Sequence, residues 1–200
     1  MTAPATYARL APFYDFVYGF GLSHGRRCAM ERLSPRPGEW ILEIGTGTGL
    51  SALDYPVPCS VVAIDLSPAM LTRARTRLAM LNAHHIRLCR MDAMHLGFPD
   101  GMFDAVYAPY VVNVVRDPLA ALREMRRVCR PNGRIVLLNH FSGTGRDGKV
   151  SKLLGRFASV AGDAKWDLNL KLLDQARLAP SSMEHVNLGG VSSVVVCRRT

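Results

Sequence analysis

Short apolar runs alternate with longer amphipathic stretches along most of this chain. From residue 40 onward, five runs of five or six residues are rich in β-branched and other apolar residues, which is typical of buried strands. These runs are WILEI (40–44), SVVAI (60–64), IRLCR (86–90), FDAVYA (103–108) and RIVLLN (134–139). The stretches between them carry helical patterns, and this alternation predicts a parallel sheet covered by helices.

Several of the predicted helices have recognisable ends. Ser67 followed by Pro68 predicts a helix start, and that helix extends to about Leu81. Asp117 followed by Pro118 predicts a second helix, which reaches about Cys129 and is ended by the turn RPNG (130–133). Two further helices are expected over about 150–160 and 167–177.

The end of the chain predicts a β-hairpin. MEHVNL and VSSVVVCRR flank a Gly-Gly pair that suits a tight turn. Five strands and this hairpin together predict an α/β fold with a seven-stranded, mostly parallel, doubly wound sheet.

The segment APFYDFVYGF (11–20) predicts an amphipathic aromatic helix ahead of the first strand. Phe13, Phe16 and Phe20 share one helical face with Val17, and Tyr14 and Tyr18 form an adjoining stripe. This helix could pack on the domain behind it, face a membrane, or cover a substrate. We therefore expect an N-terminal helical segment over residues 1–33 and one domain over residues 34–200.

Composition narrows the class of protein. The net charge of +9 over 200 residues implies anionic partners, which could be nucleic acid or acidic lipid. Five widely spaced cysteines without a CxxC pair indicate neither a disulfide framework nor a zinc site. No secretory pattern or membrane-spanning apolar run is evident. We expect a monomeric cytoplasmic protein without a metal.

A glycine-rich loop follows the first predicted strand in LEIGTGTGL. Gly45, Gly47 and Gly49 allow a tight turn that a ligand can approach closely, and Asp65 ends the second strand, where a carboxylate can accept ribose hydroxyls. A dinucleotide GxGxxG pattern would need glycine at Leu50, and no phosphate P-loop GxxxxGK[ST] is present. The pattern thus favours an adenosine-type cofactor other than a dinucleotide.

The pattern Glu43-x-Gly45-x-Gly47-x-Gly49 resembles motif I of the class I S-adenosylmethionine-dependent methyltransferases, which have a Rossmann-like fold. The resemblance implies that S-adenosylmethionine is the cofactor and S-adenosylhomocysteine the product. It also implies that Glu43 orients the loop or meets the methionine end, Asp65 holds the ribose, and Met91-Asp92-Ala93 reads the adenine edge. The cofactor-binding residues that it implies are Tyr14, Glu43, Gly45, Thr46, Gly47, Gly49, Asp65, Leu66, Met70, Met91, Asp92, Ala93 and Ala108.

Nucleic-acid substrates fit the sequence poorly. Pro58-Cys59 precedes the second strand, so the cysteine nucleophile of cytosine C5 methylation is not in its required place after the fourth strand. Ala108-Pro109-Tyr110 lacks the Asn/Asp-Pro-Pro-Tyr/Phe wall of exocyclic-amine methylation, and no target-recognition module is present. We therefore expect no nucleic-acid partner.

Residues 6–141 resemble the bacterial phosphatidylethanolamine N-methyltransferases of the peripheral, soluble type, with GRRCA, YVVNVV and NHF carrying the specificity. This resemblance implies successive methylation of a phospholipid amine, toward phosphatidylcholine, at an anionic membrane surface. A quinone or other amphiphile as the methyl acceptor remains an alternative. So does a non-catalytic module that binds cofactor and anions.

Several residues gain expected roles from this resemblance. His140 is the best-placed base to deprotonate the amine, with water, the lipid phosphate or a tyrosine as alternatives. Tyr14, Tyr18 and Tyr110 can form an aromatic wall for methylated ammonium groups. Arg26 and Arg27 can hold the lipid phosphate, and Phe13, Phe16 and Phe20 can contact the membrane.

Overall fold

A computed structural model of the chain describes residues 22–55, 59–139, 170–187 and 192–199. The aromatic helix expected over 11–20 and the helix expected over 150–160 lie outside these ranges. Within them, no helix combines the length and the apolar character needed to cross a bilayer.

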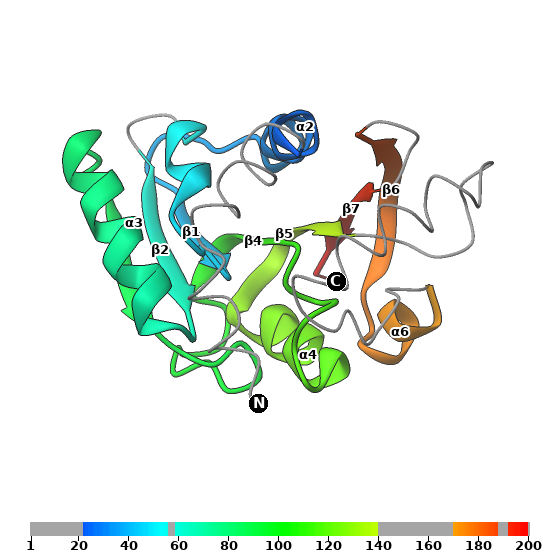
Figure 1. Ribbon diagram of the computed structural model, residues 1–200. Coiled ribbons are helices and arrows are strands. Elements are labelled where there is room, and N and C mark those ends of the chain that lie inside the picture. Colours follow the sequence, from blue (N-terminus) through cyan, green and yellow to red (C-terminus); the bar gives the residue numbers. More distant parts are fainter. Residues whose placement is uncertain (1–21, 56–58, 140–169, 188–191, 200) are drawn as a thin grey trace.

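Seven strands form a single sheet in the order β3-β2-β1-β4-β5-β7-β6 (Figure 1). The first five strands are parallel to one another, whereas β7 is antiparallel to both β5 and β6. The strands are β1 (Trp40–Ile44), β2 (Ser60–Asp65), β3 (Ile86–Arg90), β4 (Phe103–Pro109), β5 (Cys129–Asn139), β6 (Ala179–Val186) and β7 (Ser192–Arg198). The predicted α/β architecture and its C-terminal hairpin are therefore confirmed.

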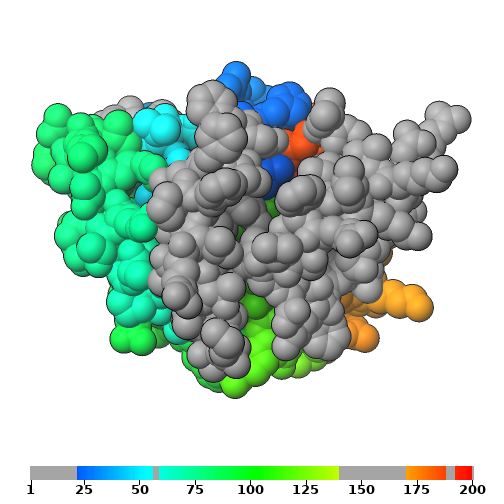
Figure 2. Space-filling model, in the orientation of Figure 1, coloured from blue at the N-terminus to red at the C-terminus, as the bar shows by residue number. Residues whose placement is uncertain are grey.

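Helices cover both faces of the sheet. Helices α4 (Pro118–Val128) and α6 (Leu170–Gln175) pack on one face, against residues such as Leu42, Val106 and Ile135. Helices α2 (Ser23–Leu33) and α3 (Pro68–Met80) pack on the other face, against the neighbouring residues of the same strands. Because successive residues of a strand point to opposite faces, each strand contributes to both cores. Figure 2 shows α3 and α6 at opposite flanks of the molecule.

The two helix starts predicted from a polar residue followed by proline are confirmed. The Ser67 hydroxyl accepts a hydrogen bond from the Met70 amide at 3.4 Å. The Asp117 carboxylate accepts one from the Ala120 amide at 3.0 Å. Each side chain thus satisfies a backbone donor that the first helical turn leaves without an intrahelical partner.

Three stretches of the described chain differ from their predictions, one of them being β6, which begins at Ala179, four residues before the expected MEHVNL. After the glycine loop, where only a helical pattern without stated bounds was expected, the chain forms a short 3₁₀ helix, η1 (Leu50–Leu53). Strand β5 begins at Cys129, five residues before the predicted start. Asn132 takes a φ of 60°, and the amide of Asn132 donates to the Arg199 carbonyl, so residues 130–133 form an irregular part of the strand.

Helix α2 is fastened to the C-terminal half of the sheet. Arg134 on β5 donates to the carbonyl oxygens of Leu33 and Ser34 at the end of the helix. Arg32 forms an ion pair with Glu184 on β6 at 2.7 Å. These contacts fix the last turn of α2 against β5 and β6.

Candidate active site

The glycine loop is the centre of the candidate site. Gly45, Gly47 and Gly49 all take positive φ angles, of 71°, 57° and 77°. The amides of Gly45 and Thr46 both donate to the carbonyl oxygen of Ile64, at 2.8 and 2.9 Å. These bonds hold the loop against the carboxyl end of β2, at the edge where α/β sheets bind their ligands.

The three glycines face different surroundings. A Cβ atom at Gly45 would lie 2.1 Å from Cγ2 of Val111, and one at Gly49 would lie 3.3 Å from the backbone of Ala74. A Cβ atom at Gly47 would meet none of the described residues within 4 Å. Gly45 and Gly49 are therefore required for packing, whereas Gly47 borders space that the described residues leave open to a ligand.

Asp65 is held in place by the loop it faces. One carboxylate oxygen accepts a hydrogen bond from the Gly47 amide at 2.8 Å, and the other accepts one from the Ser67 amide at 2.8 Å. Burial raises the pKa of Asp65, and these backbone hydrogen bonds oppose that rise. The result is a carboxylate with a fixed orientation and remaining acceptor capacity, which suits a pair of ribose hydroxyls.

Glu43 lies beneath the loop and is almost fully buried. Burial raises its pKa from 4.5 to about 7, and the nearby hydroxyls of Ser51, Tyr55 and Thr46 oppose this effect. Its atom Oε1 makes no hydrogen bond within the described residues. Tyr107 is its neighbour on β4, so Glu43 sits in a buried pocket of hydroxyl groups.

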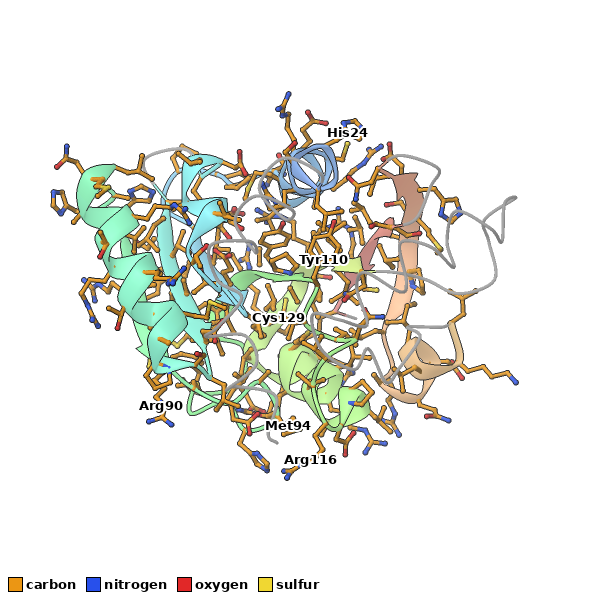
Figure 3. All side chains as sticks on the ribbon, viewed as in Figure 1. His24, Arg90, Met94, Tyr110, Arg116 and Cys129 are labelled. Atoms are coloured by element: carbon orange, nitrogen blue, oxygen red, sulfur yellow. The ribbon has the colours of Figure 1, made fainter. Side chains whose placement is uncertain are left out.

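The segment after β3 forms the next part of the rim. The Met91 amide donates to the Asp65 carbonyl at 3.2 Å, and the Asp92 carboxylate accepts from the Met94 amide at 2.9 Å. Ala93 is buried. The Met94 sulfur accepts from the Asp117 amide at 3.3 Å, which joins this segment to the loop after β4. Met94 and Arg116 accordingly lie at the same end of the molecule (Figure 3).

The remaining predicted cofactor residues differ in exposure. Leu66 is half exposed directly after Asp65, where its side chain can border a ligand. Met70 and Ala108 are buried, and Ala108 belongs to the core beneath α4. Because the side chains of Met70 and Ala108 are buried, their part in the site is limited to their backbone and to packing behind its walls.

Tyr110 follows β4 in an unusual conformation and lies beneath α2 (Figure 3). Its φ is 57°, and its amide donates to the Leu138 carbonyl at 2.6 Å. Its hydroxyl accepts a hydrogen bond from the side-chain amide of Asn187 at 3.1 Å. The same Asn187 donates to Ser192 at 3.0 Å and accepts from the Gly25 amide at 2.8 Å.

Asn187 and Val111 were not predicted as functional residues. Asn187 stands just before the Gly-Gly turn, and its φ of 66° is consistent with a turn position. Nothing in the sequence indicates its bond to Gly25, which lies 162 residues away. Val111 belongs to YVVNVV, one of the stretches that carry the family resemblance, but no role of its own was predicted for it.

The two predicted lipid-binding arginines lie near the loop end of the site. Arg26 is half buried and Arg27 is exposed. Burial raises the pKa of Asp54, and the positive charges of Arg26 and Arg27 oppose that rise, so both arginines lie within electrostatic range of Asp54. The other predicted residues, Phe13, Tyr14, Phe16, Tyr18, Phe20 and His140, lie outside the described residues.

The described part of the site has the features that S-adenosylmethionine requires. Gly47 borders open space, Asp65 offers an oriented carboxylate, and Glu43 holds a buried oxygen that lacks a hydrogen-bond partner. Among the residues described here, no group of three or more His, Cys, Asp or Glu side chains could hold a metal ion.

Sheet order, glycine loop and acidic partner together define a methyltransferase of class I. The chain matches the family model described as a methyltransferase domain over residues 42–137. The chain belongs to the class I S-adenosylmethionine-dependent methyltransferases, and S-adenosylmethionine is its cofactor.

Individual relatives differ in their methyl acceptors. The chain is 36% identical to a phosphatidylethanolamine N-methyltransferase of Cereibacter sphaeroides, over 89% of this chain and 92% of that protein. It is also 36% identical to a demethylmenaquinone methyltransferase of Thermus thermophilus, over 66% of this chain and 63% of that protein. A SAM-dependent methyltransferase from Aquifex aeolicus shares the fold, with a TM-score of 0.68, 15% identity and full coverage of both chains.

Proposed function

We propose that this enzyme transfers methyl groups from S-adenosylmethionine to the amine of phosphatidylethanolamine and then to its monomethyl and dimethyl forms. The observation that carries this proposal is the extent of the match to the Cereibacter sphaeroides protein. That match covers 89% of the chain, so it continues well beyond the methyltransferase core at 42–137. Because one fold can host many functions, similarity beyond the common core says more about the substrate than similarity of the core alone.

The described residues have defined parts in this proposal. Asp65 would accept the ribose hydroxyls, and the backbone at Gly47 would allow the cofactor to approach the loop closely. Glu43 would support the cationic methionine end, directly or through water. The bound cofactor supplies an electrophilic methyl group, and the protein aligns the amine with it and excludes water.

The amine must lose a proton before it can attack. An ammonium group of this type has a pKa near that of lysine, about 10, so deprotonation at pH 7 costs about 4 kcal/mol. We propose His140 as the base, because in the sequence it directly follows Asn139, the last residue of β5. Water, the lipid phosphate or a tyrosine are the alternative acceptors.

Aromatic and basic residues would hold the lipid. Methylated ammonium groups lose hydrogen-bond donors and are stabilised by aromatic faces, a role that we assign to Tyr14, Tyr18 and Tyr110. Arg26 and Arg27 would bind the lipid phosphate. Phe13, Phe16 and Phe20 would enter the lipid interface.

These roles assign different functions to two parts of the chain. Residues 1–33 would form a lid and membrane-contacting segment, and residues 34–200 would form the catalytic domain. The enzyme would act as a monomer on the inner face of the cytoplasmic membrane, with anionic phospholipid as its surface and neither metal nor nucleic acid as a partner.

A quinone is the second candidate acceptor. The match to the Thermus thermophilus protein has the same identity, but it covers 66% of this chain and 63% of that protein. The match to the quinone methyltransferase therefore covers less of both chains than the match to the phospholipid enzyme, which favours the lipid over the quinone.

A direct competition between acceptors tests the proposal. Full-length protein is incubated with methyl-labelled S-adenosylmethionine and vesicles that contain both phosphatidylethanolamine and demethylmenaquinone. We expect label in the three methylated phospholipids, and none with Asp65→Ala as the control. Label in the quinone alone would overturn the phospholipid assignment while leaving the methyltransferase class intact.

A further inference from the structure

A solvent-open hollow of about 310 Å³ lies between α4 and α6. These two helices lie next to each other in Figure 1. It is lined by Arg123, Arg126, Gln175, Ala176 and Arg177. The two helices pack together beneath it through the apolar core on that face of the sheet. The hollow is therefore framed by two elements that the fold holds in a fixed relation.

The lining is strongly cationic. Among the described residues that line it, three of five are arginines and none is acidic, and Asp174, the acid nearest to Gln175 in the sequence, is not one of them. Arg123, Arg126 and Arg177 form no ion pair within the described residues. Three unneutralised guanidinium groups around one hollow repel one another, so an anion that enters it would be stabilised by all three.

Arg126 adds a second, independent observation. Its Nε atom is buried from solvent and has no hydrogen-bond partner. Burying a donor without a partner is costly. Adjacent Arg127 shows the contrast, because its guanidinium donates to Glu124, Asp100 and two backbone carbonyls. The guanidinium of Arg127 is thus used by the fold, whereas the Nε–H of Arg126 makes no hydrogen bond to the described residues.

The hollow lies away from the cofactor loop. Helix α6 is followed by β6, whose first residue, Ala179, pairs with Arg198 of β7. Arg198 in turn pairs with Arg134, near the amino end of β5. Arg177 therefore lies toward the amino edge of the sheet, whereas the glycine loop and Asp65 lie at the carboxyl edge.

We propose that this hollow is a second binding site, specific for a phosphate-bearing anion. Guanidinium groups bind phosphate through paired charge-assisted hydrogen bonds, which the three arginines that line the hollow would supply. The phosphate can belong to a soluble phosphomonoester or to the headgroup of an anionic lipid. The proposal is independent of which methyl acceptor the enzyme uses.

The first test measures binding of inorganic phosphate to the full-length protein by calorimetry. S-adenosylhomocysteine is kept at saturation so that phosphate cannot bind at the cofactor loop. We expect Arg126→Gln to weaken phosphate binding about tenfold or more, since one charge-assisted hydrogen bond is lost. Arg177→Asn, which tolerates the φ of 55° at that position, should weaken binding similarly.

Arg75→Gln is the matched control, because it removes the same charge from an exposed position on α3. It should leave phosphate affinity unchanged. The melting temperature reports folding separately: phosphate should raise it in the wild type and in Arg75→Gln, but not in the two hollow variants.

A second arm identifies the source of the phosphate. The same four proteins are sedimented with vesicles of phosphatidylcholine that contain phosphatidylglycerol. A loss of vesicle binding confined to the hollow variants assigns the site to a lipid headgroup, and a loss confined to inorganic phosphate assigns it to a soluble anion. The proposed site would be overturned if all four proteins bound both inorganic phosphate and vesicles with equal affinity. It would also be overturned if Arg75→Gln lost as much binding as the two hollow variants.

Discussion

Gly45 and Gly47 belong to the same loop, but their different surroundings predict different effects of substitution on stability. Gly45→Ala places a Cβ atom 2.1 Å from Val111 and adds an alanine at a φ of 71°. We expect the free energy of unfolding to fall by about 2 to 4 kcal/mol. Gly47→Ala has the backbone cost without the clash, so its loss should be about 1 to 2 kcal/mol. Urea denaturation measures both values.

Among folded molecules, Gly47→Ala should weaken ligand binding more than Gly45→Ala does, which is the reverse of their order in stability. Gly47→Ala projects a methyl group into open space at the site, so we expect at least about tenfold weaker S-adenosylhomocysteine binding by calorimetry. The double variant Gly45→Ala/Val111→Ala should regain part of the lost stability. If Gly47→Ala bound the product like the wild type, the close approach at this glycine would be wrong.

Glu43 should make stability depend on pH. Because burial raises its pKa from 4.5 to about 7, the folded chain holds a proton at Glu43 that the unfolded chain has lost between these values. The Glu43 contribution to the free energy of unfolding is therefore full below about pH 4.5. It falls as the pH rises to about 7 and stays constant above that.

The variant Glu43→Gln isolates this effect, since it mimics the protonated group and does not titrate. Relative to the variant, the wild type should lose about 3 kcal/mol between pH 4.5 and pH 8. Urea denaturation of both proteins across this range gives the difference, in which the other titrating groups cancel. Parallel curves would show that Glu43 keeps its ordinary pKa in the folded protein.

At the scale of elements, Asn187 joins parts of the chain that are distant in sequence. It bonds α2 at Gly25, the end of β4 at Tyr110, and β7 at Ser192. Asn187→Gly removes the side chain and permits the φ of 66°, so the loss reports these bonds rather than backbone strain. We expect a fall in the free energy of unfolding of about 1 to 3 kcal/mol.

Tyr110→Phe is the matched control, because it removes only one of the three bonds and keeps the ring. Its loss should be about 1 kcal/mol, measured by the same urea titration. If Asn187→Gly were as stable as the wild type, Asn187 would not fasten α2 to the sheet.

The same elements show which features a sequence can predict. Ser67-Pro68 and Asp117-Pro118 specify helix starts through bonds to residues three positions away, so local sequence suffices. The glycine loop and Asp65 come together because both lie at carboxyl ends of adjacent parallel strands. By contrast, the early start of β5 depends on pairing with Arg199, and the role of Asn187 depends on Gly25. Such contacts form only after the sheet has assembled.

At the scale of the whole molecule, the arginines divide into two groups. Arg32, Arg127, Arg130 and Arg134 form ion pairs that hold elements of the fold together. Others, such as Arg73, Arg75 and Arg87, are exposed. Because the net charge is +9, the second group leaves a positive field that extends into solvent.

This field leads to a prediction about membrane binding. If charge steers the protein to lipid, cosedimentation with phosphatidylcholine vesicles should increase with added phosphatidylglycerol. It should also decrease as salt rises from about 0.1 M to about 1 M, because the screening length shortens from about 10 Å to about 3 Å. Insertion of aromatic side chains does not depend on long-range fields, so binding through Phe13, Phe16 and Phe20 would persist at high salt.

A chain that lacks residues 1–20 separates the two contributions. If charge steering acts alone, vesicle binding should be salt-sensitive with or without this segment. If the segment also acts as a lid, the truncated chain should lose both its residual vesicle binding at high salt and its turnover. Full turnover by the truncated chain on detergent-dispersed lipid would remove the lid role, and vesicle binding indifferent to salt and to phosphatidylglycerol would remove the steering role.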